Sequence, residues 1–228
     1  FLSFINQLSI PIIEDCAQSL GTSFKRKPTG TFGKIGCFSF YPTKNLGALG
    51  DAGAIITDDI KVYSKLLKLR QYGWNNNKVS IIDGYNTRID EIQSLILRIK
   101  FKYFKKNISK KNTIAKLYND ELRGLPILTP KLKKNVIHSF HLYVIRVNAS
   151  VRNKLIKFLQ SKKIFCSIHY KRPLHKMPIA KKYFIKSDLK NTNKIVNEII
   201  SLPMYAELKK YEVIYIIKQI KLFYSLNK

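Results

Sequence analysis

Residues Ile35–Gly53 read IGCFSFYPTKNLGALGDAG, and this stretch decides the fold. Its first part, Ile35–Tyr41, is a run rich in apolar and aromatic residues, which predicts a buried strand. The part that follows, Thr43–Gly53, is rich in glycine and predicts an irregular loop. Lys44 therefore lies between a buried strand and a glycine-rich loop. Such a lysine can be held partly out of water and act as a nucleophile, although a surface lysine in a loop is the competing interpretation.

The segments on both sides extend this pattern toward an α/β fold. Ser9–Ile13 is a short apolar run ending in two acidic residues, and it predicts a second buried strand. Gly21–Gly36 predicts a loop with one short hairpin, and Ala54–Thr57 a third strand. Two aspartates then predict the N-cap of a helix over Ile60–Gln71. Ligands of open α/β sheets bind at the carboxyl ends of strands, so Asp15 is a candidate ligand contact, with a helix cap or surface turn as the alternative.

The rest of the chain is richer in helical patterns. Apolar residues recur at helical spacing from Asp90 to about Leu122, which predicts one long helix or two abutting ones. Further elements are expected behind it: strands at His138–Val147 and Ile164–His169, and amphipathic helices at Ser150–Lys162, Asp188–Ser201 and Lys210–Tyr224. We therefore expect a strand-and-loop half over residues 1–105 and a compact α+β unit over residues 106–228.

Composition bounds the class of protein. The chain has 228 residues, of which 45% are hydrophobic and 12% aromatic, as is typical of a globular protein. It has no apolar run of about 18 residues, so no membrane helix is expected. The apolar N-terminus has no basic leader or cleavage site and predicts a folded segment rather than a signal peptide. The three cysteines are odd in number and lack CxxC spacing, which favours free thiols and the cytoplasm.

The charge balance is strongly basic, with 42 Lys and Arg against 14 Asp and Glu, a net charge of +28. Nucleic-acid binding is one interpretation. The basic residues are spread along Lys61–Lys228 instead of gathering in one arm, which favours solvated lysine-rich helix faces and no nucleic-acid partner. A basic surface would still attract an anionic nucleotide substrate.

Seven motifs, in order along the chain, resemble the DegT/DnrJ/EryC1/StrS family of sugar aminotransferases. They are EDCAQSLG (Glu14–Gly21), GxxGxFSFYPTKNLG (Gly33–Gly47), GDAGA (Gly50–Ala54), GYNTRIDEIQ (Gly84–Gln93), HLYVIR (His141–Arg146), IHYxxPLH (Ile168–His175) and SLPM (Ser201–Met204). The resemblance implies an α/β fold, the aspartate-aminotransferase-like fold type I of transferases that depend on pyridoxal phosphate (PLP). Residues 1–105 would form the C-terminal half of the PLP-binding large domain and 106–228 the small domain. The family's first half-domain has no counterpart in this sequence.

The resemblance also implies a cofactor site. Lys44 would be the Schiff-base lysine, and Asp15 would keep the pyridine nitrogen of PLP protonated. Gln18 would lie beside the ring, and Ser39 would hydrogen-bond the phosphate. Asn86 would reach the phosphate across the interface of a homodimer. From the residues alone, Ser39 is equally a strand hydroxyl bonded to backbone, and Asn86 a turn residue.

Substrate contacts are implied more weakly. His169 and Tyr170 match a segment close to the sugar in the family, and Tyr85 is expected to line the nucleotide-sugar cleft or the core. Lys171 stands where the family usually has proline. Arg88 is expected to form a structural ion pair near Asp90. The four histidines lack metal-ligand spacing, so no metal is expected.

The stretch around Lys44 looks closest to enzymes that aminate C3 of a dTDP-3-keto-6-deoxyhexose, with glutamate as amino donor. The product would be a 3-amino sugar nucleotide for surface polysaccharide or a glycoside. The alternatives are a C4-specific aminotransferase, a related dehydratase and a truncated, non-catalytic remnant. The dehydratases replace the lysine with histidine, so the presence of Lys44 favours transamination.

Overall fold

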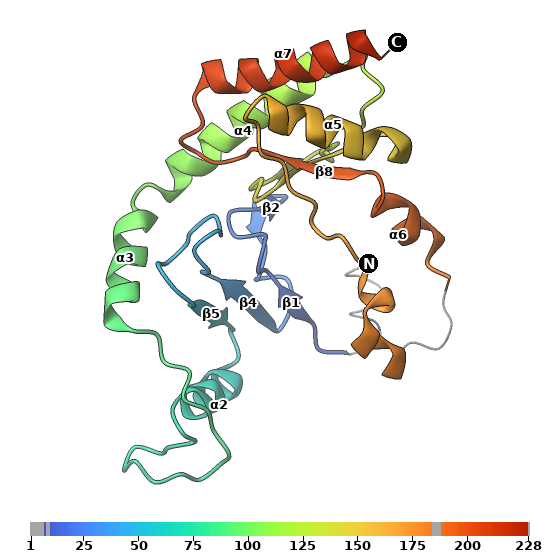
Figure 1. The fold of residues 1–228 in the computed structure, drawn as a ribbon. Helices are drawn as coiled ribbons and strands as arrows, with labels where there is room; N and C mark the ends of the chain where they lie inside the picture. The colour runs from blue at the N-terminus through green and yellow to red at the C-terminus, as the bar shows by residue number, and fades with distance from the viewer. Residues whose placement is uncertain (1–6, 8–9, 184–187, 228) are drawn as a thin grey trace. The chain divides into compact units, whose positions relative to one another are not determined.

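The structure, a computed structural model, describes residue 7 and residues 10–183 and 188–227 (Figure 1). The chain divides into two compact units, Phe1–Ser109 with Lys133–His141, and Lys110–Leu132 with Leu142–Lys228. The domain bounds expected at residues 105 and 106 stay a prediction. Lys133–His141 joins the first unit because its strand pairs there with an earlier hairpin.

The central sheet of the first unit has three strands in the order β1-β4-β5. Strand β1 (Ile13–Asp15) runs parallel to β4 (Ile35–Ser39), which runs antiparallel to β5 (Gly53–Ile56). Asp15 lies opposite Cys37, so β4 continues past the end of β1 as far as Ser39. Because β1 and β4 are parallel, Asp15 and Ser39 lie at the same edge of the sheet.

The expected strand that runs from Ser9 into two acidic residues is present only in its last part, and the expectation that it is buried is wrong, because Ile13 is 65% exposed. Strand β1 begins only at Ile13, and residues 10–12 are not in a strand; Ser9 lies outside the described residues. Pro11 has no backbone N–H to give to a ladder, which explains why pairing starts after it. The expected hairpin in the loop is confirmed, since β2 (Ser23–Phe24) pairs with β3 (Lys27–Pro28). Strand β6 (Val136–Ile137) pairs with the other edge of β2.

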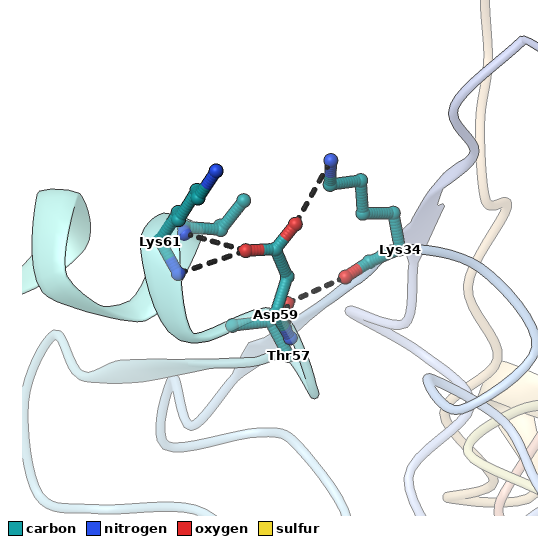
Figure 2. A network of polar contacts seen from close by, with 5 residues as sticks. Lys34, Thr57, Asp59 and Lys61 are labelled. Carbon is teal, nitrogen blue, oxygen red and sulfur yellow. Dashed lines mark hydrogen bonds and ion pairs between the residues drawn. The ribbon is translucent and has the colours of Figure 1, made fainter.

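Helix α2 (Ile60–Arg70) starts at a polar network around Asp59, drawn in Figure 2. One carboxylate oxygen of Asp59 accepts from the backbone N–H groups of Lys61, at 2.8 Å, and Val62, at 3.1 Å. The other lies 3.0 Å from Lys34 Nζ. Thr57 Oγ1 accepts from Asp59 N and donates to the carbonyl of Lys34 at 2.7 Å. The N-cap predicted from the sequence is confirmed, and it ties α2 to the residue directly before β4 and to the residue directly after β5.

The apolar pattern after Asp90 forms two abutting helices, α3 (Glu91–Phe101) and α4 (Phe104–Glu121). They supply three of the five buried members of a hydrophobic cluster, and the loop after β4 supplies the other two. The buried members are Leu46, Ala48, Leu97, Phe104 and Ile108. The glycine-rich loop is therefore anchored by apolar contacts to the helices that follow it in the sequence.

The second unit packs two helices against a two-stranded sheet. Strand β7 (Tyr143–Arg146) is antiparallel to β8 (Ile199–Leu202), and helices α5 (Ala149–Ser161) and α7 (Lys210–Leu226) lie together on one side of it (Figure 1). The largest fully buried side chains among the described residues of this unit are Tyr118, Leu122, Tyr143, Ile145, Leu155, Leu159, Ile200, Val213 and Ile220.

Two expectations in this unit are wrong. Ile164–His169 forms no strand; it is irregular chain with one isolated bridge, between Ser167 and Ser201. The helix expected over Asp188–Ser201 is only α6 (Lys190–Ile195), and β8 follows it. All four residues of β8 are buried, so this run suits a strand covered on both faces better than an amphipathic helix. Two short 3-10 helices, Leu174–Lys176 and Pro178–Lys182, precede α6.

Within the part of the chain that the structure describes, no helix is long and apolar enough to cross a membrane.

Candidate active site

A pocket of about 640 Å³ lies in the first unit, at the carboxyl end of β4. It contains two of the residues singled out in the sequence, Ser39 and Lys44. Its lining comes from the end of β4, the glycine-rich loop, the start of β5, the end of α2 and the connection before α3: Ser39, Tyr41, Lys44, Asp51, Ala52, Gly53, Arg70, Thr87, Arg88 and Ile89. Segments far apart in the sequence thus meet around the lysine.

The loop around Lys44 is fixed by its own backbone. Lys44 N donates to the carbonyl of Tyr41 at 2.8 Å, which closes a turn directly after β4. A side chain at Gly47 would collide with the carbonyl of Pro42, so only glycine lets the loop fold back this closely. The Asn45 amide donates to the backbone carbonyls of two other segments. Lys44 is therefore a half-buried side chain on a loop held from both ends.

The second cationic group with a defined position is Arg88. Its Nε donates to Asn86 Oδ1 at 3.2 Å, and its guanidinium lies over the Tyr72 ring, 5.4 Å from the centroid. The expected ion pair with Asp90 is wrong, because no salt bridge joins these two described residues. Its Nη2 also donates to the Tyr72 hydroxyl at 3.4 Å, so the N–H groups of Nη1 and one N–H of Nη2 are left for the pocket.

The pocket's donor set suits a phosphate ester. Three cations and three hydroxyls, those of Ser39, Tyr41 and Thr87, line it against one carboxylate, that of Asp51. Guanidinium groups and hydroxyls are the usual side-chain partners of phosphate oxygens. Reasoning from the sequence missed Arg70 and Thr87. The signal for Thr87 was present, because it lies inside the motif GYNTRIDEIQ.

Asp15 lies at the sheet edge near this pocket but is not among its lining residues. It is exposed, and its Oδ1 accepts from Ala17 N at 3.0 Å. The preceding residue, Glu14, has a structural role. Its carboxylate accepts three backbone N–H groups at 2.6–2.8 Å, from a loop that ends just before β4. Since neighbouring strand residues point to opposite faces, Glu14 is directed to that loop and Asp15 away from it.

The other predicted site residues lie outside the pocket lining. Gln18 and Tyr85 are exposed, and Asn86 forms an isolated bridge with Gln71 beside the pocket. His169 and Tyr170 belong to the second unit, where His169 Nδ1 lies 2.9 Å from Ser201 Oγ. The roles expected for all of these residues, and for Asp15, Ser39 and Lys44, stay predictions. Among the described residues, no group of three His, Cys, Asp or Glu side chains is placed to hold a metal ion.

Known proteins resemble this chain over nearly all of its length. It is 36% identical over 217 residues to the "pleiotropic regulatory protein" of Geobacillus stearothermophilus, covering 93% of this chain and 58% of that protein. It is 34% identical to the UDP-N-acetyl-3-dehydro-alpha-D-glucosamine 3-aminotransferase of Acidithiobacillus ferrooxidans, and that match covers 89% of this chain and 54% of that protein. It is 35% identical to a dTDP-3-amino-3,4,6-trideoxy-alpha-D-glucose transaminase of Micromonospora megalomicea, and that match covers 87% of this chain and 54% of that protein. The chain thus spans little more than half the length of these relatives.

Solved structures give the same picture. A DegT DnrJ EryC1 StrS aminotransferase from Brucella abortus matches with a TM-score of 0.92 and 30% identity, over 97% of this chain and 59% of that one. The PLP form of the "putative sugar aminotransferase Spr1654" of Streptococcus pneumoniae matches with a TM-score of 0.83 and 25% identity, and the match covers 93% of this chain and 57% of that one. The expected fold, PLP-dependent transferase fold type I, is confirmed.

The family model described as "DegT/DnrJ/EryC1/StrS aminotransferase family" matches residues 3–221. With the lysine-centred pocket at the end of β4, this match leads to one conclusion: the chain belongs to the DegT/DnrJ/EryC1/StrS aminotransferase family.

Proposed function

We propose that this chain carries the lysine-bearing part of the active site of a PLP-dependent sugar-nucleotide aminotransferase. The observation that carries the proposal is the single pocket in which Lys44 and Ser39 meet two arginines and a threonine. A primary amine beside a phosphate-binding donor set is what an aldehyde cofactor with a phosphate arm requires. The residues present therefore fit PLP, and the PLP form of Spr1654 adds support.

Lys44 would have two tasks in the reaction. Its ε-amine would hold the cofactor covalently before substrate arrives. Once a substrate amine has taken its place, the freed amine would move a proton at the substrate carbon that bears the nitrogen. PLP, when bound, supplies the electron sink that makes this carbon acidic. The turn from Tyr41 to Lys44 would keep the amine in place during both tasks.

The remaining cofactor contacts come from residues around the pocket. Ser39, Arg70, Thr87 and Arg88 would bind the phosphate arm. Asp15, at the neighbouring strand end, would hold a proton at the ring nitrogen. Gln18 would lie against the ring, and Asn86 would act on the phosphate of a partner subunit in a homodimer, as the family resemblance implies.

The substrate class is inferred from the relatives. The A. ferrooxidans and M. megalomicea proteins are named for amination or a product at C3, one on a UDP-sugar and one on a dTDP-sugar. These names support a 3-keto sugar nucleotide, and the motif around Lys44 favours dTDP-3-keto-6-deoxyhexose, with glutamate as donor. His169, Tyr170 and Tyr85 are the proposed substrate contacts. The product would serve a surface polysaccharide or a glycoside. Three free cysteines suit a cytoplasmic enzyme.

The role of Lys44 can be tested by reducing the bond between the lysine and PLP, which fixes the cofactor on the protein. The full natural chain that contains this sequence would be incubated with PLP, reduced with borohydride, digested and analysed by mass spectrometry. We expect a pyridoxyl group on Lys44 and none in Lys44→Arg, with Ser39→Ala needing more PLP for half-labelling. Lys34→Arg, which changes a lysine outside the pocket, is the control. Labelling of other lysines with Lys44 unmodified would contradict the proposal and favour a non-catalytic protein.

The position of amination needs a second experiment. The same protein would be assayed with glutamate and with 3-keto and 4-keto forms of dTDP- and UDP-sugars. Higher kcat/KM for the 3-keto sugars is expected. Faster turnover of a 4-keto sugar would rule out the C3 assignment while leaving the aminotransferase proposal intact.

A further inference from the structure

A larger pocket, of about 870 Å³, lies within the second unit and shares no residue with the pocket around Lys44. It is formed by the segment after α5, the segment after β8 and the first turns of α7. We call it the tyrosine pocket, and it is lined by Lys162, Lys163, Ile164, Phe165, Pro203, Tyr205, Leu208, Tyr211, Glu212, Ile214, Tyr215, Ile216 and Lys218.

The tyrosine pocket presents aromatic rings to solvent. Phe165 and Tyr211 are 70% and 71% exposed, although each has a large apolar surface. Tyr215 is fixed instead, because its hydroxyl donates to the carbonyl of Lys162 at 3.2 Å. Burial, followed by the nearby Glu212, raises the pKa of Tyr205. Exposed rings around a hollow suit a flat aromatic ligand, which can stack on them.

The charge of the pocket is positive. Three lysines line it against one acid, Glu212. The carboxylate of Glu212 already accepts from Lys209 N at 2.7 Å and lies in the first turn of α7, where the helix dipole offsets its charge. Lys162 is partly engaged, since its Nζ lies 5.6 Å from the centre of the Phe158 ring. Lys163 and Lys218 are thus the cations best placed for an anionic ligand.

The end of α5 fixes the backbone at Lys163. Ile164 N donates to Leu159 O and Lys163 N to Gln160 O, both at 2.9 Å. This pair of bonds is the Schellman motif that ends α5, and it puts Lys163 at φ 60°, a position where glycine is strongly preferred. Because glycine suits this backbone position, Lys163→Gly removes the cationic side chain from the pocket lining without disturbing the turn.

We propose that the tyrosine pocket binds a nucleoside di- or triphosphate, with the base against Phe165 and Tyr211 and the phosphates at Lys163 and Lys218. The volume lies in the range of small-ligand sites, roughly 300–1,000 Å³. The aromatic side chains would stack on the base, and the lysines without an acidic partner would bind the phosphates. An acidic peptide would use the lysines and leave the rings without a stacking partner.

Equilibrium dialysis with dTDP and ATP tests the proposal on the full natural chain. Lys163→Gly is the decisive variant, because glycine suits the backbone there. We expect it to keep or raise the melting temperature and to weaken binding at least about 5-fold. Tyr211→Ala should weaken binding similarly, and the matched control Lys210→Ala, one residue before it on α7 and outside the lining, should bind like wild type.

The site and the ligand class are tested separately. Photolabelling with 8-azido-ATP should modify peptides from residues 162–165 or 203–218. Labelling confined to residues 39–53 or 70–89 would overturn the proposal, because those segments line the pocket around Lys44. Thymidine and pyrophosphate should each bind more weakly than dTDP. Unchanged affinity in both Lys163→Gly and Tyr211→Ala, or binding of oligonucleotides with none of mononucleotides, would also overturn it. None of these outcomes affects the borohydride test of Lys44.

Discussion

Two adjacent acids at the end of β1, Glu14 and Asp15, have different roles that only the structure separates. The sequence predicted an acidic strand end and, through the family resemblance, a functional Asp15. The sequence could not show that Glu14 accepts three backbone N–H groups, because the spacing of apolar residues does not predict the conformation of a loop. The alternation of strand residues explains how one acid can be structural while its neighbour is left for the site.

This difference predicts opposite effects of mutation. Glu14→Ala leaves three N–H groups of the loop before β4 without their charged acceptor and should lower the free energy of unfolding by about 2–3 kcal/mol. Asp15→Asn keeps an oxygen for Ala17 N and should change it by less than about 0.5 kcal/mol. Urea unfolding of both variants gives the comparison. An equal decrease in the free energy of unfolding in both variants would show that the loop before β4 does not depend on Glu14.

Lys111, on α4, is a buried cation. Burial lowers its pKa from 10.5 to about 8, while Glu207 opposes the shift. Between these two pH values the unfolded chain binds a proton that the folded chain lacks, so this lysine makes stability rise with pH. Below about pH 8 both states are protonated and the full cost of burying the charge is present.

Lys111→Met removes that titration. We expect the free energy of unfolding of the variant, minus that of wild type, to fall by on the order of 2 kcal/mol between pH 7 and pH 10. The exposed neighbour Lys110→Met controls for the general loss of one charge and should give a nearly constant difference. A constant difference for Lys111→Met as well would mean that its amine titrates normally.

At the scale of elements, the N-cap of α2 was predicted from two aspartates in the sequence, and the structure shows which of them caps the helix (Figure 2). Asp59 caps two N–H groups and pairs with Lys34, whereas its neighbour Asp58 is exposed. Asp59→Ala should lower the melting temperature by about 2–4 °C. Asp58→Ala is the matched control and should have little effect. If the two variants melt alike, the cap does not stabilise the fold.

The same cap has a defined pH dependence. The backbone N–H of Val62 is the largest cause, and Lys34 the next, of the lowered pKa of Asp59. A carboxylate with a lowered folded pKa stabilises above its unfolded pKa and loses that contribution as pH falls through the folded value. The difference in melting temperature between wild type and Asp59→Asn should therefore be constant from pH 7 to 5 and shrink below about pH 4.

Helices and strands could be predicted where the sequence pattern of a segment agrees with the way the segment packs in the fold. The strand at β4, the capped helix α2 and the helices α5 and α7 all follow from apolar runs, periodicity or caps. The run Ile199–Leu202 was mistaken for the end of a helix. A short apolar run reads equally as helix or strand, and its pairing with β7, more than fifty residues earlier, decides between them.

The pocket around Lys44 was predictable only in part for the same reason. The sequence placed Lys44 and Ser39 together because they are close in the chain. Arg70 and Thr87 join them through the pairing of Gln71 with Asn86, which closes a long connection after α2. Such closures depend on long-range contacts, so Arg70 and Thr87 are the lining residues that the sequence alone did not predict.

At the scale of the whole molecule, charge is the property most open to test. With 42 basic and 14 acidic residues, at least 28 cations have no acid to pair with, and the described residues show only four ion pairs. Unpaired charges of one sign repel one another and destabilise the compact state. The repulsion acts over roughly a Debye length, which shortens from about 30 Å at 0.01 M salt to about 10 Å at 0.1 M.

Raising NaCl from about 0.01 to 0.3 M at pH 7 should therefore increase the melting temperature by several degrees, with most of the gain at the low end. Sulfate should act at lower concentration than chloride because its double charge screens more strongly. A DNA-binding titration over the same salt range tests the rejected nucleic-acid interpretation, which predicts a steep loss of DNA affinity as salt rises. A melting temperature that falls with salt would mean that attractive pairs outweigh repulsion, contrary to an evenly spread excess of lysine.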